Sequence, residues 1–221
     1  MCWNKDVSLN TFIFSILSLL FIYYNNKYTK YKIKEFTSIW VYLLFASFIS
    51  MQLAEYFLWK YMGNKKLNKI FTCLVIFLIL LQPLCSLMLL ESDDLKYNMM
   101  LSYFLLIGVL LCFYFVNKII NIKTSVADNG HLNWEWLPSI SSNFIFCAIW
   151  SLWFFFLFYP LYKTNIRLMI IWSFILCVSL YTYLKQHTYQ SMWCWMSNFI
   201  MFIFLIQILI ILPYKDKGTL C

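Results

Sequence analysis

The chain has 221 residues, of which 63% are apolar and only 12% are charged. A soluble domain carries roughly 25% charged residues, so about half of the usual solvating surface is missing. The net charge of +8 would suit nucleic acid, but the basic residues fall in short connections between apolar runs. Because no segment outside these runs is large enough for a recognition domain, nucleic-acid binding is excluded. The composition predicts an integral membrane protein whose lysines meet lipid head groups.

The first apolar run begins after Lys5 and ends in bulky Tyr23 and Tyr24. A secretory signal peptide would end in a small-residue cleavage site, so we expect a retained first helix. Six further runs follow, each close to the roughly 20 residues that a spanning helix needs. They are continuously apolar rather than alternating, which excludes membrane strands. The predicted fold is an all-α, polytopic transmembrane bundle forming a single domain over 1–221, with spans near 8–24, 36–59, 70–90, 99–116, 144–162, 168–184 and 191–212.

The second run, Phe36–Trp59, contains the carboxylate Glu55. An ionisable group inside such a run is costly and is a functional-site hypothesis by default. Gln52, Glu55 and Trp59 are spaced to share one helix face. Glu55 lies roughly 7 Å below Lys60 along the helix, a depth that suits the floor of a water-filled vestibule. The alternative is structural: a shallow Glu can snorkel or pair with a loop lysine.

The third run contains Gln82-Pro83. Proline has no N–H to donate, so we expect a kink whose freed carbonyl is satisfied by a neighbouring helix. A gate or binding role is the alternative.

The connection after the fourth run carries Asn129-Gly130, which is a turn signal, and then His131. An amphipathic lead-in, Trp134–Asn143, precedes the fifth run. With seven spans, this connection, the end of the second run and the start of the seventh lie on one membrane side. The start of the seventh run presents a polar stripe on one helix face. The predicted ligand-binding set is Gln52, Glu55, Trp59, His131, Trp134, Glu135, His187, Ser191, Trp195 and Asn198. The alternative for the histidines and tryptophans is ordinary packing at the membrane interface.

Several chemistries are excluded by what the runs lack. The basic residues lie outside the runs or at their edges, so no buried lysine is available for a retinal Schiff base. No cysteine and histidine spacing suits a metal, so we predict no metal and no cofactor. The basic residues divide almost evenly between the two sides, which leaves the orientation undetermined.

Three short stretches carry a resemblance: Gln52-x-x-Glu55-x-x-x-Trp59, Gln82-Pro83, and Ser191-Met192-Trp193-Cys194-Trp195. In these the chain resembles an uncharacterised family of multi-span membrane proteins from large DNA viruses and marine plankton. The resemblance implies a viral or protist source and a shared polar face, and it carries no known activity.

Three functions remain open from the sequence. The first is a channel, transporter or receptor-like binder that handles a small solute, ion or lipid around Glu55, with the bilayer as its constant partner. The second is a structural or assembly protein without a ligand. The third is a membrane-embedded, lipid-acting enzyme in which Glu55 works with a histidine.

Overall fold

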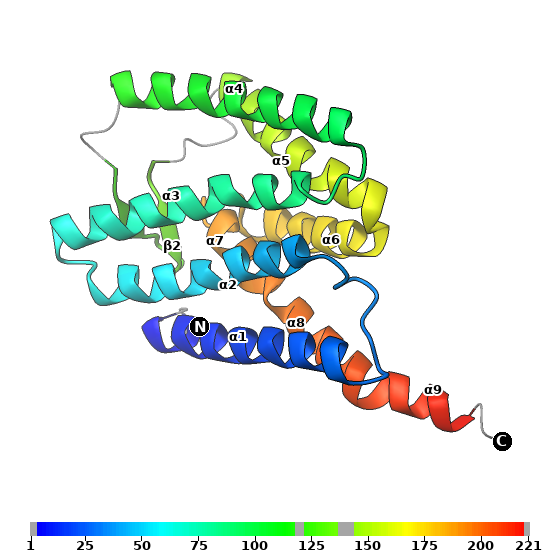
Figure 1. The fold of residues 1–221 in the computed structure, drawn as a ribbon. Coiled ribbons are helices and arrows are strands. Elements are labelled where there is room, and N and C mark those ends of the chain that lie inside the picture. Colours follow the sequence, from blue (N-terminus) through cyan, green and yellow to red (C-terminus); the bar gives the residue numbers. More distant parts are fainter. Residues whose placement is uncertain (1–3, 118–121, 137–143, 219–221) are drawn as a thin grey trace.

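The computed structural model describes residues 4–117, 122–136 and 144–218, and the regular secondary structure of these residues is helical apart from one short hairpin (Figure 1). The hairpin consists of β1 (Thr124–Val126) and β2 (Leu132–Trp134). The helices are α1 (Lys5–Tyr28), α2 (Ile39–Lys60), α3 (Lys65–Leu87), α4 (Asp93–Asn117), α5 (Phe144–Thr164), α6 (Ile166–Tyr183), α7 (Tyr189–Ser197), α8 (Phe199–Ile206), the π-helical η2 (Gln207–Ile211) and α9 (Leu212–Gly218).

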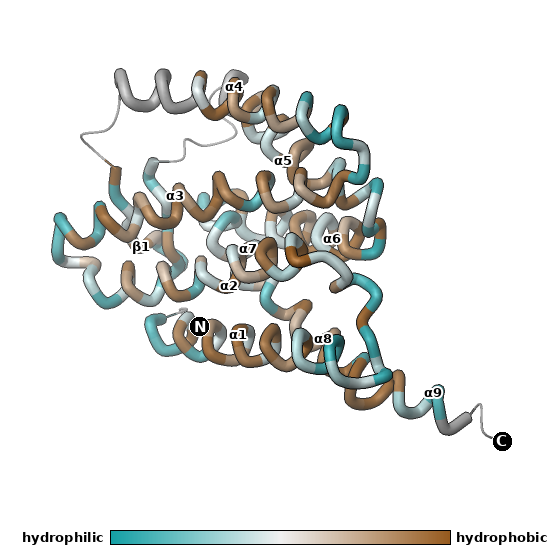
Figure 2. Tube along the Cα trace, viewed as in Figure 1, coloured by the Kyte–Doolittle hydropathy of each residue, from teal (hydrophilic) through white to brown (hydrophobic). Residues whose placement is uncertain are grey.

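Five helical segments in the described part of the chain are long and apolar enough to cross a membrane. They are α1, α2, α3, α6 and the rod from α7 into α9. Helices α4 and α5 cover the predicted runs 99–116 and 144–162. The expected helical bundle is therefore confirmed, and the number of seven spans stays a prediction. Figure 2 shows apolar residues along α1 and α3 and hydrophilic residues at the turn that joins α2 to α3.

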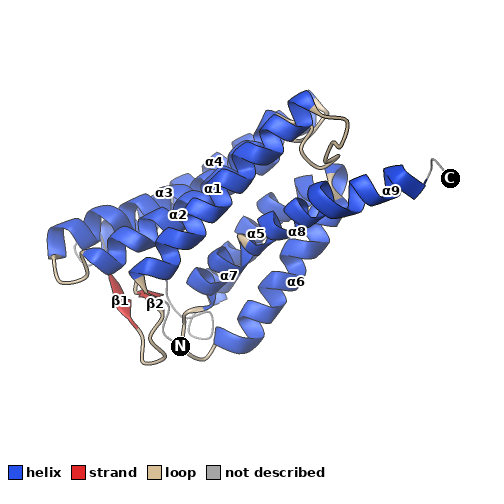
Figure 3. Cartoon of the chain, turned by 90° about the horizontal axis from the view of Figure 1, so that it is seen from below, coloured by secondary structure: helices blue, strands red, loops and turns tan. Residues whose placement is uncertain are grey.

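The helices are arranged in two layers. Figures 1 and 3 show α1 to α4 side by side in one layer, with α5 to α8 behind them. Helix α2 has the largest buried share of the five candidate spans, so it is the central helix of the bundle. Its Phe45 and Phe48 rings pack on Trp172 of α6, with centroids 4.9 and 5.0 Å apart. Rings of this size supply much of the contact area that joins the layers.

The helix starts follow local sequence signals. Asn4, Ser38, Asn64 and Asn165 each precede a helix, and each side chain accepts a hydrogen bond from a backbone N–H of the first turn. These first-turn N–H groups have no partner inside the helix, so such caps stabilise each start by about 1 kcal/mol.

The proline of α3 is accommodated as its sequence predicts. Pro83 cannot donate to the carbonyl of Ile79, and the indole Nε1 of Trp153 on α5 donates to that oxygen at 3.1 Å. In the same contact, Ser86 Oγ donates to the carbonyl of Leu157 on α5 at 2.6 Å. The expectation that a neighbouring helix satisfies the freed carbonyl is confirmed.

The connection between α4 and α5 differs from the expectation. It contains an antiparallel hairpin in which Thr124 pairs with Trp134, whereas the sequence predicted no strand there. The cause is a tertiary contact: the Asn68 side chain of α3 bonds both the backbone N–H and the C=O of Thr124, at 3.0 and 2.9 Å. The expected turn is present, with Gly130 at a φ of 77°. Trp134 is a strand residue, not the start of an amphipathic lead-in, and residues 137–143 lie outside the described ranges.

The last run is longer and less regular than one helix over 191–212. The rod begins at Tyr189 and is interrupted at Asn198, where the backbone N–H bonds the carbonyl of Trp195 three residues back. The Asn198 side chain also donates to the carbonyl of Cys194 at 2.8 Å. A side chain that competes for helix carbonyls in this way favours such a break. A π turn follows at Gln207–Ile211.

Candidate functional site

Glu55 lies inside the bundle, on the central helix. Glu55 is only 3% exposed. Ser191 Oγ of α7 donates to Glu55 Oε1 at 2.6 Å, and Gln52 Nε2 donates to Oε2 at 3.0 Å. The structure thus brings together three of the predicted site residues, two from α2 and one from the last rod. We call Gln52, Glu55 and Ser191 the Glu55 cluster.

The Glu55 cluster has a carboxyl group but includes no positively charged side chain. The ion pairs found among the described residues involve Glu35, Asp93, Glu135 and Asp216, and none involves Glu55. The remaining oxygen of the cluster, Gln52 Oε1, is buried and has no hydrogen-bond partner within the described residues. A buried carboxylate is costly unless it is paired, so this group requires a proton or a cation from outside the described chain.

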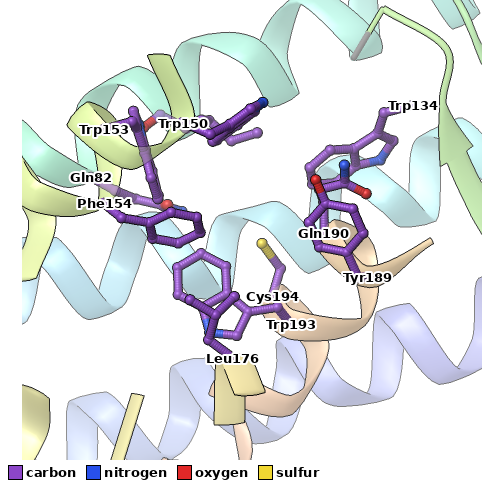
Figure 4. A pocket seen from close by; sticks show the side chains of 11 residues that line it. Gln82, Trp134, Trp150, Trp153, Phe154, Leu176, Tyr189, Gln190, Trp193 and Cys194 are labelled. Carbon is purple, nitrogen blue, oxygen red and sulfur yellow. The ribbon is translucent and has the colours of Figure 1, made fainter. Parts of the chain in front are cut away.

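A small hollow lined mainly by aromatic residues lies inside the bundle (Figure 4). Its volume is about 20 Å³, and its lining comes from α3, β2, α5, α6 and α7. Cavities of roughly 10–15 Å³ or more hold one water molecule when polar groups are present. In Figure 4, Trp150, Trp153 and Phe154 lie on one side and Trp134, Tyr189 and Gln190 on the other, with Trp193 and Cys194 below them.

Some residues that line the hollow carry buried polar atoms without a partner among the described residues, although the surface that faces the hollow is almost entirely apolar. Both amide atoms of Gln82 and the indole nitrogen of Trp134 are buried without a hydrogen bond to any described residue. Cys194, one turn after Ser191 on α7, lines the hollow. The hollow and the Glu55 cluster therefore adjoin through α7, and the hollow is large enough for a guest of about the size of a water molecule.

The hairpin residues of the predicted set lie at the same end of the bundle as the start of α7. Asn129 Nδ2 donates to Thr188 Oγ1 at 2.9 Å, which ties the hairpin to the turn before α7. His131 packs edge-on against Tyr183, with ring centroids 5.3 Å apart, and burial lowers the pKa of His131. Glu135 pairs with Lys123 at 3.0 Å. Figure 3 also places the hairpin beside the α6–α7 turn.

The other predicted residues lie apart from the Glu55 cluster. His187 is exposed in the α6–α7 turn, at a φ of 56°, and Trp59 is half-buried against the core. Trp195 Nε1 donates to Thr11 Oγ1 of α1 at 3.0 Å, and Asn198 also faces α1. The polar residues that follow Ser191 on the same face of the rod therefore contact different helices: Ser191 bonds Glu55 of α2, and Trp195 bonds Thr11 of α1. Three of the ten predicted residues therefore meet at the Glu55 cluster, and the other seven lie elsewhere.

Two features go beyond the main expectations from the sequence. Gln82 was predicted to mark a kink, with a gate or binding role as the alternative, and the structure places it among the residues that line the aromatic hollow. The ion pair between Arg167 and Glu35, with Nη1 and Oε1 2.5 Å apart, joins the α1–α2 connection to the start of α6. Each rests on a contact between distant segments, and the only local signal was Arg167 as the sole arginine.

A scan against protein-family models, a search of curated proteins and a search of solved structures each found no match. The class of the protein therefore rests on the chain itself. It is a helical bundle whose described residues include five segments long and apolar enough to cross a membrane, which is consistent with a membrane location.

Proposed function

We propose that this chain is a multi-pass integral membrane protein of the channel or transporter class, handling a small cation or solute, with Glu55 as the group that binds a proton or cation. One observation carries the proposal. A carboxyl that is 3% exposed on the central helix accepts two side-chain hydrogen bonds and has no basic partner among the described residues.

The physical argument is one of charge balance. Acidic residues within membrane helices typically face the bundle interior, pair with a basic group and mark ion or proton pathways. Here the donors are the neutral groups Ser191 and Gln52, which orient the carboxyl but bring no positive charge. In this proposal the balancing charge is a proton or cation that binds Glu55 and leaves it, because acids inside membrane helices mark ion pathways and proton relays.

The size of the hollow favours a small guest. A volume of about 20 Å³ suits water, a proton carried by water, or a small inorganic ion better than an organic cation. Gln82 and Trp134 line the hollow and carry polar side-chain atoms without a partner among the described residues, and in this proposal those atoms bind such a guest.

A structural role is the second candidate, and one observation favours it. Both carboxyl oxygens already accept hydrogen bonds, so Glu55 joins α2 to α7 much as polar side chains join membrane helices elsewhere. A protonated Glu55 would serve this role with no ligand.

Infrared difference spectroscopy of the purified protein in lipid nanodiscs separates the two. The proposal expects a carboxyl band that responds to pH or to added Na⁺ or K⁺, and that disappears in Glu55→Gln. Exposed Glu91 provides the matched control, because Glu91→Gln removes the same charge outside the bundle. In liposomes that hold the protein and a pH-sensitive dye, the cation-driven proton flux should be lower by about tenfold or more for Glu55→Gln than for the native chain. A Glu55 band indifferent to all three cations, with unchanged flux, would leave only the structural role.

A further inference from the structure

A second hollow lies on the opposite side of the last rod, between α1 and the α7–α8 segment. Its volume is about 360 Å³, which falls in the roughly 300–1,000 Å³ range of small-molecule sites. Figure 1 shows α1 beside α8, and the two helices are in contact. We call this hollow the α1 groove, and it is lined by Asn10, Thr11, Phe14, Ser15, Trp195, Asn198, Phe199 and Phe202.

Two polar atoms in the α1 groove are buried without a partner. Ser15 is 0% exposed and Asn198 is 3% exposed, and neither Ser15 Oγ nor Asn198 Oδ1 has a hydrogen bond to any residue in the described ranges. Ser18, one turn further along α1, behaves differently: its hydroxyl donates to the carbonyl of Phe14 at 2.6 Å. A serine hydroxyl inside a helix often bonds a carbonyl of the preceding turn, as that of Ser18 does, but the Ser15 hydroxyl makes no such bond.

The depth of these atoms excludes bulk water as their partner. Ser15 lies ten residues after Lys5, or about 15 Å along the helix, which is roughly half of the hydrocarbon thickness. A buried polar group without a hydrogen bond costs on the order of 1–3 kcal/mol. Both residues line the α1 groove, so a ligand there that both accepts and donates hydrogen bonds would satisfy the two atoms.

The rim of the α1 groove is apolar and outward-facing. Phe14, Phe199 and Phe202 are all exposed. Helix α1 as a whole is little buried, so its flank adjoins lipid in the proposed membrane arrangement. The described residues that line the groove include no charged side chain, which disfavours a phosphate or ammonium head group.

We propose that the α1 groove binds an uncharged lipid alcohol, such as a sterol or a diacylglycerol. The lipid hydroxyl donates to Asn198 Oδ1 and accepts from Ser15 Oγ, and the apolar body packs on the three phenylalanine rings. This site is separate from the Glu55 cluster and does not depend on the role of Glu55.

Photo-crosslinking of the full chain in nanodiscs tests the proposal. The probes are photoactivatable cholesterol and photoactivatable diacylglycerol, with the labelled peptides mapped by mass spectrometry. Label from at least one probe is expected on the groove residues of α1 or α8, and the stronger probe identifies the lipid class. Unlabelled lipid of that class should compete, whereas its O-methyl ether, which cannot donate to Asn198, should compete at least about fivefold less well.

The variants use a serine pair on one helix. Ser15→Ala is expected to lower groove labelling about threefold or more, while Ser18→Ala and Glu55→Gln leave it unchanged. The ether comparison needs no variant, so the test stands even where a substitution disturbs folding. Equal competition by the ether, labelling absent from the groove, or a Ser15→Ala chain labelled like the wild type would overturn the proposal. Chain-to-chain crosslinks at Phe199 in place of lipid would instead assign the groove to a second copy.

Discussion

Trp153→Phe is expected to expose the hydrogen-bonding defect that Pro83 leaves in α3. In the native protein the indole Nε1 of Trp153 satisfies the carbonyl of Ile79 at 3.1 Å. Phenylalanine keeps a ring at this buried position but cannot donate. Hydrogen bonds between membrane helices contribute about 0.6 kcal/mol on average and about 1.7 kcal/mol at most. A loss in this range is expected from the missing bond, in addition to the loss of ring contacts.

A double-mutant cycle with Pro83→Ala separates these two contributions. Alanine restores an N–H at position 83, which can bond the carbonyl of Ile79 within the helix. In that background Trp153→Phe should cost about 0.6–1.7 kcal/mol less than in the native chain, because the carbonyl no longer depends on the indole. The ring-contact loss is common to both backgrounds and cancels.

The assay is reversible unfolding of the purified protein in mixed lipid–detergent micelles, followed by tryptophan fluorescence and helix content. Trp150→Phe is the matched control, since Trp150 packs on Trp153 with centroids 5.5 Å apart but is not the donor to Ile79. Its cost should be the same with Pro83 and with alanine. A coupling for Trp153 of zero within error, or an equal coupling for Trp150, would refute the reasoning.

Three further outcomes are expected. Arg167→Met should lower the free energy of unfolding by about 1–3 kcal/mol, because it leaves the buried Glu35 carboxylate without its partner. Arg167→Met combined with Glu35→Gln should recover most of that loss, and a double variant no more stable than the single one would contradict this. Burial lowers the pKa of His131 in the folded protein, so its contribution to stability is complete above about pH 6.5 and decreases as the pH falls below that value. Between pH 7.5 and 5.5 the melting temperature of the native chain should therefore fall more than that of His131→Phe. Equal decreases in the two proteins would contradict this. Ser191→Ala should cost about 0.6–1.7 kcal/mol in the same unfolding assay, and little or nothing when Glu55 is already leucine; equal costs in both backgrounds would contradict a bond between them.

Local sequence was sufficient for the features that depend on neighbouring residues. The apolar runs predicted the helices and the membrane class, because the length and composition of a run are enough to indicate a spanning helix. Gln52 and Glu55 were placed on one helix face by their spacing, and a hydrogen bond joins them. Pro83 predicted a carbonyl in need of an outside donor, since the missing N–H is a property of proline itself.

The tertiary structure decided which distant side chains meet. Ser191 reaches Glu55 across 136 residues of sequence, and Trp153 reaches Ile79 across 74. The hairpin exists where Asn68 of α3 bonds Thr124, a contact that no periodicity in the connection reveals. An apolar run fixes that a helix forms, but its rotation and neighbours follow from how all the helices pack together. For that reason the sequence identified the buried acid, and only the packed bundle determined its partners.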